Sequence, residues 1–155
     1  MFWDSSAIIP MLVPEARSAE MTALLGSDRA PALWWGGPVE CQSALHRRRR
    51  EEILTPAALA EALARLERLA EDVDVVAPTA RLRERAGRAL AAHPLRAADA
   101  LQLAAALVWA DDLPAGEAFV CLDDRLREAA GREGFQVLPV VPWPGPPSGT
   151  LTGPS

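Results

Sequence analysis

Four acidic residues from widely separated stretches of the chain could do chemistry together: Asp4, Glu40, Asp99 and Asp123. Asp4 and Asp123 each follow a short apolar run that predicts a buried strand. Glu40 and Asp99 lie near the beginnings of two expected helices. In open α/β sheets, ligands bind outside the carboxyl ends of the strands, so these acids could meet in one crevice.

Four carboxylates in one crevice would repel one another, and the chain offers few cations close to them in sequence. A hard divalent cation would neutralise the cluster, and Mg²⁺ prefers oxygen ligands while keeping several waters. Such a cation can activate water and stabilise charge on a phosphate. The sequence has no His pair or Cys cluster typical of zinc, no phosphate-binding P-loop and no GxSxG motif.

Each acid also has a structural alternative, which the sequence leaves open. Asp4 and Asp123 could cap the helices that follow them. Glu40 could be an ordinary acid in a first helical turn. Asp99 could gain from the helix dipole, with Arg96 as its partner.

The segment from Pro94 to Leu107 predicts a buried helix, because it is rich in Ala and Leu and apolar on almost every face. Arg96, Asp99 and Gln102 interrupt it at intervals of three, so they share one face. A buried carboxylate is costly unless it is paired. We therefore expect Asp99 to lie at a polar site cut into the core.

Elements that alternate between strand and helix must position these side chains. We expect strands at 2–3, 32–35, 73–76, 118–122 and 135–141, and helices at 7–13, 14–25, 39–50, from 56, from 80, 94–110 and 125–132. Gly26 and Gly134 should each end a helix, and Leu90 should face inward. This order predicts an α/β fold with a parallel sheet wrapped in helices.

The composition indicates one globular domain, since half of the 155 residues are apolar. The net charge of −5 excludes a generally basic nucleic-acid binder, so any such contact needs a local patch. Cys41 and Cys121 have no metal-site spacing, and neither a signal peptide nor a membrane span is expected, which favours a reduced cytoplasmic protein. Residues 1–141 should form the domain, and the Pro- and Gly-rich residues 142–155 a disordered tail.

A basic run on the helix that carries Glu40, composed of Arg47, Arg48, Arg49 and Arg50, is a candidate RNA-binding patch. Arg side chains fork onto phosphate oxygens. The alternative is a solvated helix end, where the helix dipole stabilises cations and acidic neighbours balance their charge. The two histidines, His46 and His93, are better explained as structural residues than as catalytic ones.

Four segments resemble the motifs of the PIN-domain family, and most closely those of VapC-type ribonuclease toxins from bacterial toxin–antitoxin pairs. They are Asp4-Ser5-Ser6-Ala7, Glu40 at a helix start, Ala98 to Ala104, and Phe119 to Leu126. The resemblance covers residues 1 to 141. It implies a three-layer PIN-like sandwich and an endoribonuclease that depends on Mg²⁺ or Mn²⁺. Asp4, Glu40, Asp99 and Asp123 would be catalytic, with the three aspartates holding the metal.

The resemblance also implies an antitoxin protein as partner, frequent homodimerisation, and a hydroxyl near the first acid, which Ser6 would supply. Cys121 departs from the family, where Ser or Thr is common. Two alternatives remain: a PIN-like nuclease that processes RNA or cuts DNA, and an α/β binding module whose acids only cap helices.

Of the adjacent acids Asp123 and Asp124, we expect only the first to belong to the site. Asp123 shares the inward stripe of Leu126 and Ala130 on the expected helix. Asp124 points elsewhere, three residues before Arg127, and should form an exposed ion pair with it.

Overall fold

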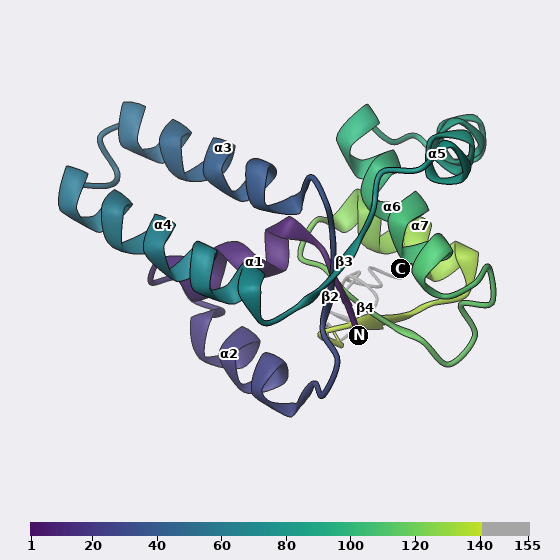
Figure 1. The fold of residues 1–155 in the computed structure, drawn as a ribbon, viewed down its shortest axis with the longest axis horizontal. Coiled ribbons are helices and arrows are strands. Elements are labelled where there is room, and N and C mark those ends of the chain that lie inside the picture. The colour runs from purple at the N-terminus through teal and green to yellow at the C-terminus, as the bar shows by residue number, and fades with distance from the viewer. Residues whose placement is uncertain (141–155) are drawn as a thin grey trace, which may run out of the picture.

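A computed structural model describes residues 1–140 and shows a five-stranded, all-parallel sheet with the order β3-β2-β1-β4-β5 (Figure 1). The elements in chain order are β1 Phe2–Trp3, α1 Ser5–Leu12, α2 Ser18–Ser27, β2 Ala32–Trp34, α3 Gly37–Arg50, α4 Pro56–Glu71, β3 Asp74–Val76, α5 Ala80–Ala92, α6 Ala97–Trp109, β4 Ala118–Val120, α7 Asp124–Glu133 and β5 Gln136–Leu138. The α/β class is confirmed. The tail predicted for 142–155 lies outside the described residues.

Helices cover both faces of the sheet, with α1 to α4 on one side and α5 to α7 on the other (Figure 1). The chain first moves from β1 outward to β3, and then returns to add β4 and β5 on the opposite side of β1. Parallel crossovers are right-handed, so reversing the direction of travel transfers the later helices to the other face. The result is a three-layer sandwich.

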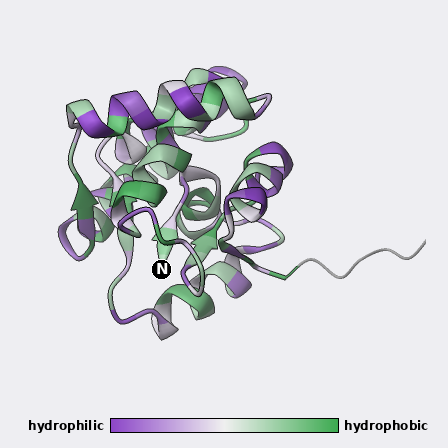
Figure 2. Ribbon diagram, turned by 90° about the vertical axis from the view of Figure 1, so that its right-hand side faces the viewer, coloured by the Kyte–Doolittle hydropathy of each residue, from purple (hydrophilic) through white to green (hydrophobic). Residues whose placement is uncertain are grey.

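The strands alternate their side chains between two hydrophobic cores, as strand geometry requires. Phe2, Trp34 and Phe119 pack against α5, α6 and α7. Trp3 and Val120 pack against α1 to α4. In Figure 2 the long helices carry hydrophobic and hydrophilic segments in alternation, as expected of helices that bury one face.

Several local predictions need correction. Gly26 lies inside α2 and does not end it, because the helix continues to Ser27. Leu90 is 46% exposed, because the buried face of α5 runs through Leu82, Ala86 and Ala89 and leaves Leu90 outside it. Gly134 does end α7, in the left-handed conformation with φ of 105°.

The parallel strands β1 and β4 lie side by side in the sheet. Between them the order in which strands are added changes direction, because β2 and β3 extend the sheet on one side of β1 and β4 and β5 extend it on the other. This is the topological switch point, where open α/β sheets place their ligands. Asp4 directly follows β1, and Asp123 lies just beyond β4. On the other side of β1, Gly36 leads from β2 into α3, and a Cβ there would lie 2.4 Å from the Trp34 indole nitrogen. Within residues 1–140, no helix is long and apolar enough to cross a membrane.

Candidate active site

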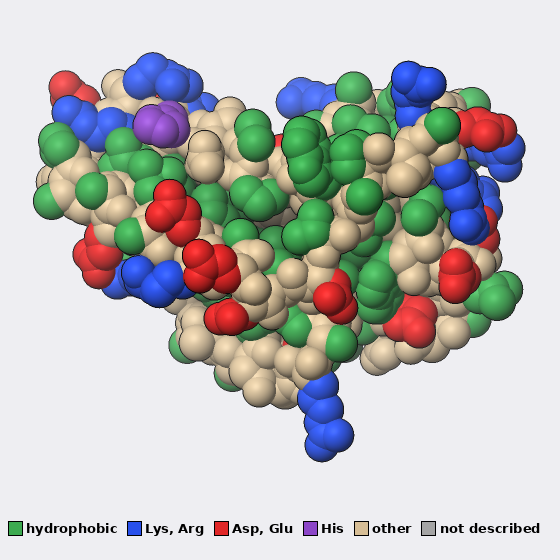
Figure 3. Space-filling view, viewed as in Figure 1, with side chains coloured by type: hydrophobic (Ala, Val, Ile, Leu, Met, Phe, Trp, Pro, Cys, Tyr) green, Lys and Arg blue, Asp and Glu red, His purple; other side chains and the backbone are tan. Residues whose placement is uncertain are grey.

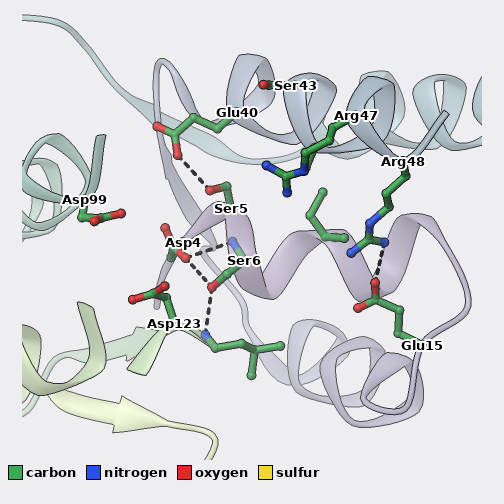
Figure 4. Close-up of a pocket in the computed structure, with 13 residues that line it drawn as sticks. Asp4, Ser5, Ser6, Glu15, Glu40, Ser43, Arg47, Arg48, Asp99 and Asp123 are labelled. Carbon is green, nitrogen blue, oxygen red and sulfur yellow. Dashed lines mark hydrogen bonds and ion pairs between the residues drawn. The ribbon is translucent and has the colours of Figure 1, made fainter. Parts of the chain in front are cut away.

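The four acids predicted from the sequence line one cavity of about 510 Å³ at this switch point (Figure 4). Four different elements or their ends supply them, and Figure 3 shows the face of the molecule hollowed between α3 and the α5–α6 side. The cavity is lined by Asp4, Ser5, Ser6, Ile9, Glu15, Glu40, Ser43, Ala44, Arg47, Arg48, Asp99, Leu122 and Asp123. The fold thus gathers acids that are far apart in the sequence.

Asp4 is the most buried of the four acids, with 3% of its surface exposed. It caps α1, and its Oδ2 accepts hydrogen bonds from the Ser6 amide at 2.9 Å and from the Ser6 hydroxyl. The Cys121 thiol contacts the same oxygen at 3.5 Å. Burial raises the pKa of the Asp4 carboxyl, and these hydrogen bonds oppose that shift only in part.

Ser6 and Cys121 link the carboxyl ends of β1 and β4. The Ser6 hydroxyl accepts a hydrogen bond from the Leu122 amide at 2.9 Å. The Cys121 sulfur accepts one from the Asp123 amide at 3.3 Å. Burial raises the pKa of both thiols, that of Cys41 to about 12, so both are protonated at neutral pH and are poor nucleophiles.

Glu40 lies in the first turn of α3 and is half-buried. Its Oε2 accepts hydrogen bonds from the Ser5 hydroxyl at 2.9 Å and from the Gln102 amide at 3.0 Å. Burial raises the pKa of the Glu40 carboxyl, and the negative charges of Asp4 and Asp99 add to the increase. The sequence placed Gln102 on the polar stripe of its helix, but gave no sign that it would contact Glu40.

Asp123 caps α7, as the structural alternative proposed, and Asp99, in the first turn of α6, bonds back to the backbone of the N-cap residue Arg96. Asp99 Oδ2 accepts from the Arg96 amide at 3.2 Å, at the beginning of α6. Asp123 Oδ1 accepts from the amides of Arg125 and Leu126, both at 3.0 Å. Capping uses one carboxylate oxygen of each residue, so it is compatible with a second role for the other oxygen.

The same division holds for all four carboxylates: within residues 1–140, one oxygen of each accepts hydrogen bonds from the protein and the other accepts none. No group of three or more Asp, Glu, His or Cys side chains in this part of the chain is drawn together tightly enough to hold a metal ion directly. The donors are all hard oxygens, with room for water between them. This set suits Mg²⁺ or Mn²⁺, which use few carboxylates directly, and does not suit zinc.

Two of the four arginines predicted to bind RNA line the cavity, namely Arg47 and Arg48 (Figure 4). Arg48 forms an ion pair with Glu15, and Arg47 forms none with any described residue. Arg49 and Arg50 lie further along α3 and do not line the cavity.

A second cavity of about 420 Å³ adjoins the first and shares Asp99, Leu122 and Asp123 with it. Its other lining residues include Arg96 and Arg125, which are exposed and pair with no acid among residues 1–140. In Figure 3, basic side chains lie on both sides of the hollow. Positive charge therefore flanks the acids from two directions.

The pair expected between Asp124 and Arg127 is absent from the described structure, so that part of the interpretation was wrong. The Arg127 guanidinium donates to the carbonyl oxygens of Cys121, Leu138 and Pro139, and so ties α7 to the ends of β4 and β5. Asp124 lines the second cavity only. His93 is buried and lies 2.6 Å from Glu133, away from both cavities.

No family model matches the chain. Two curated proteins of Mycobacterium tuberculosis, ribonuclease VapC45 and ribonuclease VapC49, are each 34% identical to it over 140 residues, covering 90% of this chain and 94% of theirs. The crystal structure of M. tuberculosis VapC20, described as a toxin that cleaves the sarcin–ricin loop, superposes with a TM-score of 0.62. It is 22% identical, and the match covers 83% of this chain and 93% of that one.

Proposed function

Since the chain belongs to the VapC family of ribonucleases, we propose that its endoribonuclease site is the cavity lined by Asp4, Glu40, Asp99 and Asp123. One observation carries this proposal: four separate elements bring four carboxylates to the switch point of the sheet, and arginines line the same cavity. Capping alone explains neither their convergence nor the arginines. The cavity is also open to a polymer, since exposed side chains form part of its wall.

Asp4, Asp99 and Asp123 are the proposed holders of Mg²⁺ or Mn²⁺, in part through waters that the cation keeps, because the three carboxylates are not close enough for all of them to bind it directly. When bound, the cation would supply an acidic water and neutralise charge on the phosphodiester. The protein side chains supply the acceptor for the proton of the attacking water. Glu40 Oε1, which accepts no hydrogen bond from residues 1–140, would take the proton of the attacking water. The water oxygen bonds to phosphorus, the P–O bond to the leaving sugar oxygen breaks, and that oxygen takes a proton from solvent.

The RNA backbone would cross the acids between the two basic sides of the site. Arg47 and Arg48 lie on the α3 side, and Arg96 and Arg125 lie on the side of the second cavity. Arginine binds phosphate through paired, charge-assisted hydrogen bonds. This arrangement explains how a chain with a net charge of −5 can hold a polyanion: the positive charge is local.

The biological role that we propose is that of the toxin in a toxin–antitoxin pair. An antitoxin segment would place an Arg against the carboxylates and so replace the charge of the metal. Trp35, just before α3, and Val39, in its first turn, are 59% and 62% exposed and offer apolar surface to such a segment. Co-purification from the native operon tests this partner, and light scattering tests the homodimer that the family resemblance implies.

RNA cleavage by the purified protein, with sequencing of the new 5′ ends, tests the enzymatic proposal. Total bacterial RNA, including ribosomal RNA, is the substrate, assayed with Mg²⁺, with Mn²⁺ and with a chelator. We expect discrete cuts that vanish with the chelator and return when metal is restored. Cleavage that persists in the chelator would refute the metal-dependent mechanism.

A further inference from the structure

Gln102 is a polar residue in the middle of a buried apolar helix. Only 1% of its surface is exposed, and it does not line the carboxylate cavity. Its Oε1 is buried and has no hydrogen-bond partner among residues 1–140. A buried polar atom without a partner costs free energy, so the stability of the helix does not explain this side chain.

The amide nitrogen of Gln102 makes the contacts that do explain it. Nε2 donates to Glu40 Oε2 at 3.0 Å and lies 3.4 Å from the Ser5 hydroxyl, which itself donates to the same Glu40 oxygen at 2.9 Å. Three helices, α1, α3 and α6, thus meet at one carboxylate oxygen. The reversed amide would set Oε1 against the Glu40 carboxylate, so electrostatics fixes the observed orientation.

We propose that Gln102 is a positioning residue of the cleavage site, which holds Glu40 by one oxygen so that the other serves the reaction. Without the amide, the flexible Glu40 side chain could leave the cavity for solvent, because only the Ser5 hydroxyl would retain it. The Glu40 carboxylate could then no longer be held within reach of the attacking water. This inference rests on the proposed function, in which Glu40 accepts the proton.

Gln102→Met tests the inference, because Met keeps the length and buried bulk of the side chain but removes the donor. We expect kcat for RNA cleavage to fall by about 10- to 100-fold, as for supporting residues of other sites, with KM nearly unchanged. Gln102→Glu should be at least as severe, since it sets a second carboxylate beside Glu40. Leu103→Met is the matched control: this equally buried neighbour belongs to the hydrophobic core and lines neither cavity, and its variant should keep the wild-type kcat.

A readout without metal or substrate separates positioning from packing. The melting temperatures of wild type, Gln102→Met, Glu40→Gln and the double variant are compared in a chelator. If the amide holds the carboxylate, the two single changes will not add in the double variant. Either additive changes or a wild-type kcat in Gln102→Met would overturn the inference. If that variant does not fold, Gln102→Leu takes its place under the same criteria.

The two proposals fail in different ways. If Glu40→Gln keeps full activity, Glu40 is not the proton acceptor and the proposed mechanism fails. If Glu40→Gln is inactive while Gln102→Met cleaves at the wild-type rate, only the positioning role of Gln102 fails.

Discussion

The Ser6 hydroxyl donates a hydrogen bond to Asp4 Oδ2, the same oxygen that accepts from the Ser6 backbone amide at 2.9 Å. Since the hydroxyl also accepts from the Leu122 amide at 2.9 Å, it joins the end of β1 to the segment after β4. One side chain thereby holds the most buried carboxylate of the site and links the carboxyl ends of β1 and β4.

Ser6→Ala should reduce cleavage by about 10- to 100-fold, because residues that orient the ligands of a site commonly contribute that much. The unpaired Leu122 amide should also lower the free energy of unfolding by about 1–3 kcal/mol. Cleavage rates and chemical denaturation measure the two effects. Ser43→Ala is the control: Ser43 lines the same cavity but makes no side-chain hydrogen bond to a described residue. Equal losses in both variants would argue against a specific role for Ser6.

Asp123→Asn should abolish cleavage, whereas Asp124→Asn should retain most of it. Asp123 lines the cavity with the other acids, and Asp124 lies outside it. Asn is itself a good N-cap, so Asp123→Asn should keep the cap of α7 and unfold at a temperature close to wild type. Cleavage rates at saturating Mg²⁺ and thermal melts decide between the two residues. An inactive Asp124→Asn would show that Asp124 belongs to the site, contrary to the assignment of that role to Asp123.

The acids at strand ends and helix starts could be predicted from the sequence, because hydrophobic patterning locates those elements and parallel strands bring their carboxyl ends to one edge. The contact between Gln102 and Glu40 could not, because it depends on how closely α3 and α6, which cover opposite faces of the sheet, approach each other beyond its carboxyl edge. The Arg127 guanidinium likewise prefers three distant carbonyl oxygens to the local Asp124. Leu90 was placed wrongly because Ala89, one residue earlier, fits the core equally well by pattern.

The metal-free protein should become less stable as the pH rises from acid to neutral. Burial raises the pKa of Asp4, so the folded state holds its proton more tightly than the unfolded state does. The stability linked to this proton is complete below the unfolded carboxyl pKa of about 3.9. It is lost as the pH rises through the raised folded pKa.

Asp4→Asn removes this titration. In a chelator the variant should therefore gain stability relative to wild type near pH 7, and the gain should shrink toward pH 4. Denaturant unfolding at several pH values measures the difference. A gain that does not change with pH would mean that the charge of Asp4 is not its source.

Arg47→Ala should weaken RNA binding and flatten its salt dependence, since each lost phosphate contact lowers the slope of log K against log salt by about 1. Arg50→Ala, at the end of the same helix and outside the cavity, is the matched control and should change both quantities little. Fluorescence anisotropy measures both quantities. The variants are made in the Asp99→Asn background, which should leave the RNA uncut. Equal slopes of log K against log salt for the two variants would mean that Arg47 belongs to a solvated helix end and makes no specific contact with RNA.

The cleavage of RNA by Asp99→Asn tests most directly whether the four carboxylates form the ribonuclease site. Asp99 lines both cavities, and Asn can still accept the hydrogen bond of the Arg96 amide, so the helix should remain capped. Wild type and variant are incubated with the same RNA at saturating Mg²⁺, and new 5′ ends are sequenced after thermal melts have verified the fold. We predict a folded variant that produces no new ends; a folded Asp99→Asn that cuts at the wild-type rate would show that the four carboxylates are not the ribonuclease site.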